Sequence, residues 1–232
     1  MPPLAAEHQG VERKIVAALE RLAQAFRVLL WEEAKAYGAS PIQLQILLYL
    51  LHAPPARCRV SALAQEFDLA PPTISDAVAS LAAKGLLQRV PWPADRRGTV
   101  LQLTPAGREL AGALTRWTDT VQAALATFSA EEKLLALGFL LRLIAALQQA
   151  GAITVARLCL TCRFFQPNVY PDPAVPHHCG LLDKPLPLAA LRVDCPDHVP
   201  VLRPGARRRR RAAAGAPPAP SSAPAPTAER PS

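Results

Sequence analysis

Four of the five cysteines in this 232-residue chain fall within 37 residues of each other in its last third. They are Cys159, Cys162, Cys179 and Cys195, and their spacing is C-x2-C-x16-C-x15-C. Thiols grouped in this way bind a metal, form a redox pair or pack as small apolar groups. The surrounding segment has no amphipathic pattern that would bury it, and so small a module usually needs a metal to fold. A thioredoxin-like pair is disfavoured because the sequence around it has no βαβ pattern. We therefore predict that these four cysteines form a metal site.

The spacing favours an iron–sulfur cluster over zinc. Zinc ribbons typically present two C-x2-C pairs, whereas one pair plus two single cysteines, the last followed by Pro196, fits a [4Fe–4S] cubane at least as well. The segment also resembles the ligand pattern of high-potential iron–sulfur proteins, although it lacks the Gly-Trp that those proteins place before their final cysteine. That resemblance implies an apolar shield of Phe164, Phe165, Leu181 and Leu182. We expect a [4Fe–4S] cluster, with zinc as the alternative cofactor and a dithiol switch still open. The histidines that could replace a thiol in a zinc site are His177, His178 and His198.

Composition and charge indicate what class of protein the chain belongs to. Half of the residues are hydrophobic, mostly Ala and Leu, which favours helices. The net charge of +8 comes mainly from residues 203–232, which carry seven Arg and one Glu. The N-terminus does not resemble a signal peptide, and the longest apolar stretch, 134–147, is too short to span a bilayer and contains Arg142. We expect a cytoplasmic protein without a membrane partner, and Cys58 is expected to be a bystander.

Periodicity and capping residues predict the elements that carry these sites. Two capping-box patterns, Ser40 with Gln43 and Ser129 with Glu132, mark helix starts, and Thr104-Pro105 marks another. The last helix is apolar on nearly every side, so we expect it to be buried, in part against a second chain. The predicted helices are 11–37, 41–52, 60–67, 71–84, a long helix from 104 and a last helix from 129; the predicted strands are 86–90 and 99–103, around a loop at 91–98.

Helices followed by a two-stranded hairpin with a basic loop are the order of a winged helix-turn-helix. In the second helix of the pair, Ile74, Val78 and Leu81 form a buried stripe. The opposite face is small and polar, as a helix that enters the DNA major groove requires. Arg96 and Arg97 at the loop suit an adjacent minor groove.

The stretch LAQEFDLAPPTISDAVASLAAKGLLQRVPWPADRRGTVLQLTPAGREL, residues 63–110, resembles the MarR family of transcriptional regulators. Its shared motifs are Thr-x-Ser in the recognition helix, Leu-x-x-Lys-Gly-Leu, Asp-Arg-Arg in the wing and Leu-Thr-Pro-x-Gly-Arg. The resemblance extends over roughly residues 11–150 and implies a homodimer, formed by the terminal helices, on a pseudo-palindromic duplex DNA operator.

Carried over by position, the resemblance implies a set of DNA-contacting residues. Asp76 departs from the family, because a carboxylate is repelled by phosphates; it either points to solvent, which we favour, or accepts a hydrogen bond from cytosine N4. Asp95 is expected to brace the wing. The expected DNA contacts are Thr73, Ser75, Asp76, Ser80, Lys84, Arg89, Arg96 and Arg97.

The sequence therefore predicts a mainly α protein with a small β-wing, a winged helix-turn-helix with long dimerising helices, plus a small irregular metal-binding module. The expected parts are a disordered N-terminus at 1–10, the winged-helix domain at 11–150, the four-cysteine module at 151–202 and a disordered Arg/Ala/Pro-rich tail at 203–232. We expect a homodimeric DNA-binding transcriptional regulator whose module senses redox state or iron, by changing the spacing of the two recognition helices. The alternative is a metal-binding or electron-transfer protein that uses the winged helix only as a scaffold. No nucleophile–base pair or phosphate-binding glycine loop indicates an enzyme, and the sequence names no effector.

Overall fold

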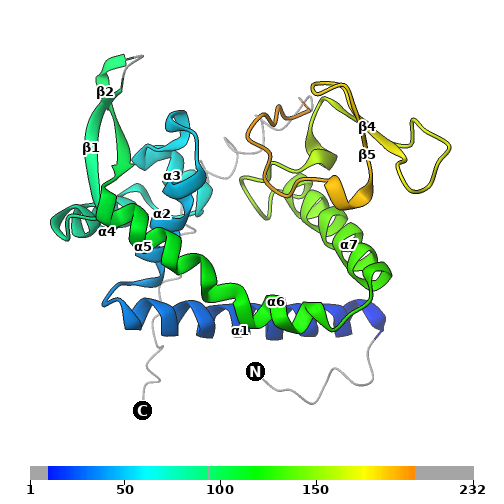
Figure 1. Ribbon diagram of the computed structural model, residues 1–232, viewed down its shortest axis with the longest axis horizontal. Coiled ribbons are helices and arrows are strands. Elements are labelled where there is room, and N and C mark those ends of the chain that lie inside the picture. Colours follow the sequence, from blue (N-terminus) through cyan, green and yellow to red (C-terminus); the bar gives the residue numbers. More distant parts are fainter. Residues whose placement is uncertain (1–9, 93–94, 202–232) are drawn as a thin grey trace, which may run out of the picture.

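The computed structural model describes residues 10–92 and 95–201, and the side chains of 95–97 lie outside that description. Figure 1 shows a helical lobe with a protruding hairpin on one side and helix α7 with a small irregular module on the other. The α-helices are α1 (Val11–Ala36), α2 (Pro41–His52), α3 (Val60–Glu66), α4 (Pro71–Ala83), α5 (Pro105–Leu114), α6 (Asp119–Ala126) and α7 (Ala130–Gln149). The strands are β1 (Leu87–Trp92), β2 (Asp95–Leu103), β3 (Phe165–Gln166), β4 (His177–Cys179) and β5 (Lys184–Leu186). The 3-10 turns used below are η2 (Pro55–Arg57), η3 (Thr115–Thr118), η4 (Cys159–Thr161) and η5 (Leu188–Ala190).

The predicted helix starts are confirmed by their caps. The Ser40 hydroxyl accepts a hydrogen bond from the Gln43 N–H, and the Gln43 side chain accepts one from the Ser40 N–H. Ser129 and Glu132 form the same reciprocal pair at the start of α7, and Thr104 caps α5 by accepting from the Gly107 N–H. These bonds satisfy N–H groups that have no partner within a helix, which is why short-range sequence signals located the boundaries correctly.

The winged-helix lobe has its own hydrophobic core. Leu44, Leu47, Leu63, Ile74 and Leu81 are fully buried where α2, α3, α4 and the β1–β2 hairpin meet. The hairpin is antiparallel, with Leu87 opposite Leu103. Burial of this apolar stripe from each helix fixes the angle between α3 and α4, on which any use of α4 in a groove depends.

Two predictions in this lobe need correction. The hairpin strands run further than predicted, so the wing loop is shorter than 91–98. The expected long helix after Thr104 is broken by η3, where the ring of Trp117 packs edge-on against Phe26 of α1 at 6.0 Å between centroids. A contact with a residue 91 positions away decides this break, so local periodicity could not reveal it.

A second core joins α7 to the four-cysteine module. Leu141 and Ala145 of α7 are buried against Ala156, Leu158 and Leu191 of the module. The module itself contains a three-stranded antiparallel sheet of very short strands, in the order β3–β4–β5. Since one face of α7 forms much of this core, the module is stabilised by the helix as well as by its own residues.

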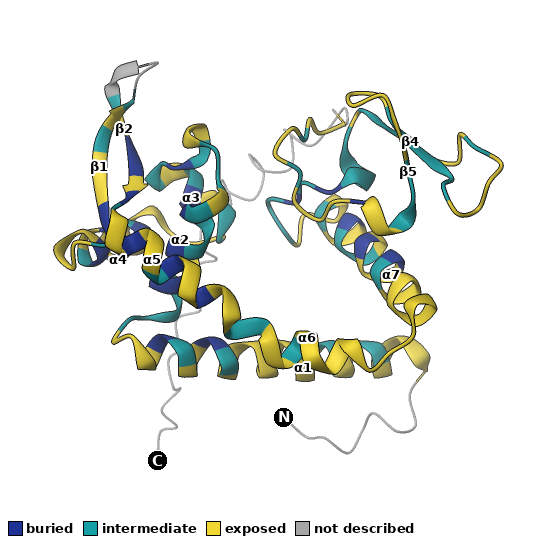
Figure 2. Cartoon of the chain, in the orientation of Figure 1, coloured by how far each residue is buried: buried dark blue, intermediate teal, exposed yellow. Residues whose placement is uncertain are grey.

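Within the single chain α7 is buried on one face only, so the expected burial of its other faces depends on a second chain. Only Gly138, Leu141 and Ala145 of this helix are buried, and Leu135 is 66% exposed. Figure 2 shows that α1 and α6 are also largely exposed, in contrast to the helices of the winged-helix lobe. Among the described helices, none has the length and apolar character needed to cross a bilayer.

Candidate nucleic-acid interface and four-cysteine site

The helix pair α3–α4 presents a polar face opposite its buried stripe. The turn between the helices contains Asp68, whose φ of 51° is in the left-handed region that allows a tight reversal. On α4, Thr73 and Asp76 are exposed, whereas Ser75 and Ser80, which were also expected to face outward, are half-buried. The outer face of α4 therefore has no bulky side chain at these four positions and could enter a groove.

Lys84 and Arg89, expected near the DNA backbone, differ in their surroundings. Arg89 projects from β1 and is exposed. The Lys84 ammonium instead donates a 2.7 Å hydrogen bond to the carbonyl of Gly38, in the α1–α2 connection. Lys84 thus ties the end of α4 to the start of α2, and this structural role was missing from the sequence interpretation.

The wing is anchored to the lobe beside the helix pair. The guanidinium of Arg59 lies over the ring of Trp92, at 4.9 Å from its centroid, and the Leu101 N–H donates to the Cys58 carbonyl at 2.6 Å. Asp95, Arg96 and Arg97 belong to β2, but their side chains lie outside the described part of the structure.

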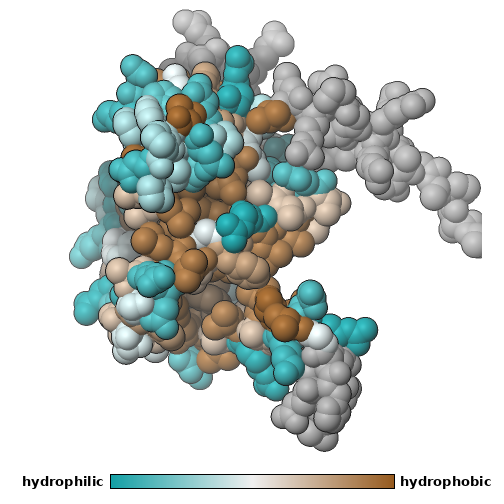
Figure 3. Space-filling model, turned by 90° about the vertical axis from the view of Figure 1, so that its right-hand side faces the viewer, coloured by the Kyte–Doolittle hydropathy of each residue, from teal (hydrophilic) through white to brown (hydrophobic). Residues whose placement is uncertain are grey.

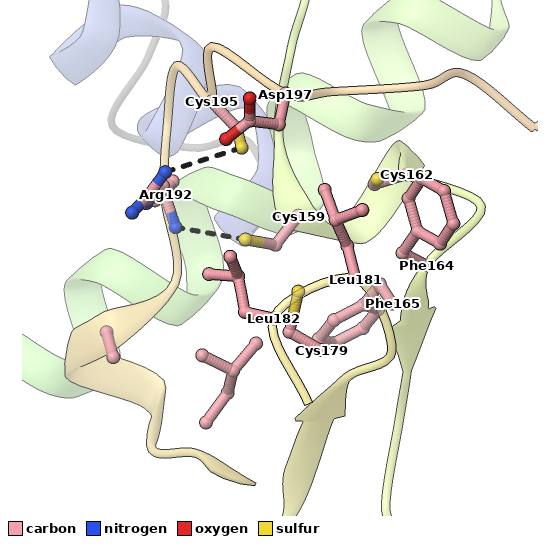
Figure 4. A pocket seen from close by; sticks show the side chains of 12 residues that line it. Cys159, Cys162, Phe164, Phe165, Cys179, Leu181, Leu182, Arg192, Cys195 and Asp197 are labelled. Carbon is pink, nitrogen blue, oxygen red and sulfur yellow. Dashed lines mark hydrogen bonds between the residues drawn. The ribbon is translucent and has the colours of Figure 1, made fainter. Parts of the chain in front are cut away.

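Three separate segments bring the four clustered cysteines to one hollow (Figure 4). Cys159 begins η4 and Cys162 follows it, Cys179 ends β4, and Cys195 lies in the loop after η5. All four are half-buried. The predicted apolar shield lines the same hollow and consists of Phe164, Phe165, Leu181 and Leu182. Four further residues line the hollow and were not predicted: Leu186, Ala190, Arg192 and Asp197.

Arg192 lies between two of the thiols and hydrogen-bonds to both (Figure 4). Its backbone N–H donates to Cys159 Sγ at 3.2 Å, and its Nη1 donates to Cys195 Sγ at 3.7 Å. Burial raises the pKa of the Cys159 thiol, while the N–H of Arg192 opposes that shift. The hydrogen bond to Cys195 raises the pKa of Arg192. Donors aimed at sulfur stabilise thiolates, the form in which cysteine binds metal.

The thiols surround the hollow and do not converge on one point. In the described segments, no three His, Cys, Asp or Glu side chains are grouped closely enough to hold one metal ion. Tetrahedral zinc needs sulfurs about 2.3 Å from a common centre. A polynuclear cluster, with an iron for each thiolate, needs ligands spread around its periphery.

The histidines named as alternative ligands have other contacts. The His177 ring packs against Phe165 and accepts from the Asn168 N–H, and His178 lies 2.9 Å from the Tyr170 hydroxyl. His198 Nε2 lies 3.0 Å from the Thr161 hydroxyl, and burial lowers its pKa. Of the residues that line the hollow in the described structure, none is a histidine.

Cys58 lies far from this hollow, in the core of the winged-helix lobe. It is buried, and its thiol is 3.5 Å from the Pro54 carbonyl and 3.6 Å from that of Ala53. Burial raises its pKa, so the thiol is held in its neutral form. The structure thus places Cys58 as a packing residue.

The structure reveals an ion-pair network that sequence reasoning missed. Arg157 Nη2 contacts both carboxylate oxygens of Glu66, at 2.7 and 2.8 Å, and Arg157 Nε donates to Asp194. Arg57 lies 3.8 Å from the same Asp194. These residues are up to 137 positions apart, so no spacing in the sequence indicates that they meet.

Comparisons with known proteins agree with this architecture. The family model that matches is that of the MarR family, over residues 37–98. The structure is similar to a S. aureus MepR–DNA complex, with 20% identity and a TM-score of 0.50 over 56% of this chain and 96% of that one. It is also similar to the transcriptional regulator PA3341, with 25% identity and a TM-score of 0.50 over 58% of this chain and 98% of that one.

No match was found among the curated proteins. Both structural relatives are covered almost completely by little more than half of this chain, so a large part of it has no counterpart in them. The helix pair, β1 and the start of β2 fall within the matched region. Residues 37–98 therefore resemble the MarR family in sequence, and the solved structures support a winged-helix fold.

Proposed function

We propose that this protein is a homodimeric, sequence-specific DNA-binding transcriptional regulator with a C-terminal module that holds a [4Fe–4S] cluster and senses redox state or iron. The observation that carries the DNA-binding part is the polar outer face of α4, set beside an antiparallel wing in the region that matches the MarR family. A winged helix of this fold is found with DNA in the S. aureus MepR–DNA complex.

In this proposal α4 enters the major groove. Thr73, Ser75 and Ser80 face the groove, and Arg89 approaches the backbone from β1. Hydroxyls bond to phosphates or base edges, while a carboxylate gains only from cytosine N4, so the exposed Asp76 points to solvent wherever that base is not beside it. Arg96 and Arg97 remain proposed minor-groove contacts.

Exposed apolar residues on the terminal helices support the homodimer. Leu135, Leu140 and Leu147 of α7 are at least 40% exposed, and Val16 and Trp31 of α1 are 55% and 63% exposed. The face turned to the viewer in Figure 3 is broadly apolar. Monomeric proteins rarely expose large contiguous apolar patches. A second copy of the chain, packed through α1, α6 and α7, is the occupant that a pseudo-palindromic operator requires.

Substitution of Arg97 tests the DNA-binding proposal. We expect Arg97→Ala to weaken binding to duplex DNA from the protein's own promoter region, and to reduce the log–log salt slope by about one unit if one phosphate contact is lost. Arg116→Ala is the matched control, because Arg116 is exposed in η3, away from the helix pair and wing. Wild-type protein that stays monomeric and ignores this DNA at low salt would contradict the proposal and favour the scaffold alternative.

The cluster is supported by the chemistry of the hollow. Four thiols from three segments share it, donors from Arg192 point at two of them, and mostly apolar side chains form the rest of its wall. Solvent access is one of the properties that set the reduction potential of an iron–sulfur centre, and Leu181 and Leu182 are 44% and 43% exposed there. When bound, the cluster would supply reversible one-electron chemistry and sensitivity to oxidants.

Metal analysis tests the cluster directly. Protein purified without oxygen should be brown and contain about four iron and four sulfide per chain, as a [4Fe–4S] cluster requires. Cys179→Ser should abolish this content, whereas Cys58→Ser should retain it, because Cys58 lies in the other core. A colourless protein with one zinc per chain would exclude the cluster and leave the DNA-binding proposal intact.

A further inference from the structure

We infer that the loop around Cys195 couples the four-cysteine site to the helix pair, with Arg157 as the positioning residue. This inference depends on the proposed function, because it specifies how the occupancy of that site would regulate DNA binding. Three consecutive residues, Asp194, Cys195 and Pro196, carry both a proposed cluster ligand and the contacts that hold the winged-helix lobe.

Arg157 makes the first connection between the two parts. Its side chain is only 13% exposed and lies between Glu66, the last residue of α3, and Asp194 of the module. Its own carbonyl accepts a 2.9 Å hydrogen bond from the Cys195 N–H. Arg157 therefore contacts the ligand loop through its backbone and α3 through its guanidinium.

The charges around Arg157 strengthen this connection. Glu66 is 20% exposed and meets the Arg157 guanidinium at 2.7 Å, and Asp194 contacts the same guanidinium from the module. Glu66 also acts on Tyr49 of α2. Burial of Tyr49 and the negative charge of Glu66 together raise the pKa of Tyr49 to about 12. A half-buried guanidinium that lost one carboxylate would be left poorly compensated, so the network favours one arrangement of α3 and the loop.

Arg57 makes the second connection, on the other side of Cys195. Its Nη2 donates to the Pro196 carbonyl at 2.6 Å, and its Nη1 lies 3.8 Å from Asp194. Arg57 ends η2, directly before Cys58, whose carbonyl accepts from Leu101 of the wing. The loop is thus linked to the wing through Arg57 and to α3 through Arg157.

The other side of the same loop faces the hollow. Cys195 Sγ accepts from Arg192 Nη1 and lines the hollow with the other three thiols. Binding of Cys195 to iron would fix its position, and neighbouring Cα atoms are only about 3.8 Å apart, so Asp194 and Pro196 would be fixed with it. Loss of the cluster would release the loop, and Glu66 at the end of α3 would lose a fixed partner next to the turn into α4.

Energetic coupling of this kind is reciprocal. If the cluster favours the DNA-binding arrangement, its removal should weaken DNA binding by a factor within about 5- to 150-fold, the usual range for coupled sites. DNA should in turn slow the loss of the cluster. A purely structural contact would change DNA affinity equally with and without the cluster, so the ratio of the two affinities is the decisive quantity.

The test compares this ratio in the full-length protein and its variants. The dissociation constant for promoter DNA is measured for protein loaded anaerobically with iron and sulfide, and again after the cluster is removed. We expect about a tenfold ratio in the wild type, within the range above. In Glu66→Gln, which keeps the shape of the side chain but removes its charge, the ratio should approach one. Asp119→Asn removes an exposed ion pair with Arg116 in the η3–α6 segment and should keep the wild-type ratio.

If Glu66→Gln loses stability, a second variant and a second measurement still test the coupling. Asp194→Asn breaks the ion-pair network on the module side. Amide hydrogen exchange in residues 60–67 should slow when the cluster is loaded into the wild-type protein. It should not slow when the cluster is loaded into either variant. A wild-type ratio of one, or an unchanged ratio in both variants, would overturn the coupling while DNA binding and the cluster stand. Failure of the wild type to bind DNA or iron would instead overturn the proposed function.

Discussion

Truncation of Leu158 should open the four-cysteine module and leave the winged-helix lobe folded. Leu158 is 1% exposed and packs against Leu141 of α7 and Leu191, directly before Cys159. Replacing a buried Leu by Ala costs about 2–5 kcal/mol, depending on how well the cavity collapses. A loss of about 3 kcal/mol raises the population of the locally opened module roughly 100-fold, since each 1.4 kcal/mol is about a factor of ten.

Amide hydrogen exchange followed by mass spectrometry measures this opening segment by segment. In Leu158→Ala, exchange should accelerate by about two orders of magnitude in 154–165 and 188–192. Exchange in 44–50 and 74–81 should change little, because those residues belong to the separate core of the winged-helix lobe. Val169→Ala is the matched control in the module: Val169 is 48% exposed, so its truncation should cost under about 0.5 kcal/mol.

The result that would refute this reasoning is equal acceleration in both lobes. It would mean that the two cores open as one cooperative unit, despite being separate clusters of buried side chains. An equally large effect of Val169→Ala would show that exposure does not predict stability in this module.

Three further predictions concern the winged-helix lobe and α7. Gly107→Ala should destabilise the protein, because a Cβ there would lie 1.8 Å from the Leu86 carbonyl oxygen. Gly112→Ala in the same helix adds a Cβ that meets no atom within 4 Å, so it should stabilise the protein by up to about 1 kcal/mol. Urea unfolding of the two variants measures both changes in stability. Ser129→Ala should lower stability by about 1 kcal/mol through loss of the α7 capping box, and unfolding unchanged from the wild type would contradict this. The pKa of Tyr49 is raised to about 12 by burial and by Glu66, so its contribution to stability is complete below pH 10 and is lost as pH rises toward 12. Tyr49→Phe should therefore show a weaker loss of stability than the wild type between pH 10 and 12 in alkaline unfolding.

Local signals in the sequence predicted the winged helix well. Each of these signals joins residues no more than four positions apart. The structure confirms the caps at Ser40 and Ser129 and the buried stripe of Ile74, Val78 and Leu81. The length of the wing strands and the break at η3 were not predicted. The break accompanies the packing of Trp117 on Phe26, which joins two helices that are distant in sequence.

The candidate sites divide in the same way. Residue type and spacing identified the four cysteines and the apolar side chains next to them, and the structure brings these together in one hollow. Arg192 was missed, although it hydrogen-bonds to two of the thiols, because an arginine three residues before a cysteine is not distinctive. The structure also gave Lys84 a bond to the Gly38 carbonyl that no motif indicated.

By itself, the sequence determined where the helices begin, which face of α4 is buried and which thiols form a group. Those properties depend on hydrogen bonds and periodicities within a few residues of the chain. Only the tertiary structure decided that the loop of Cys195 is held by Arg57 and, through Arg157, by Glu66. Ion pairs between residues 37 to 137 positions apart exist only after two cores have formed and set the backbones at a fixed distance, so no local pattern encodes them.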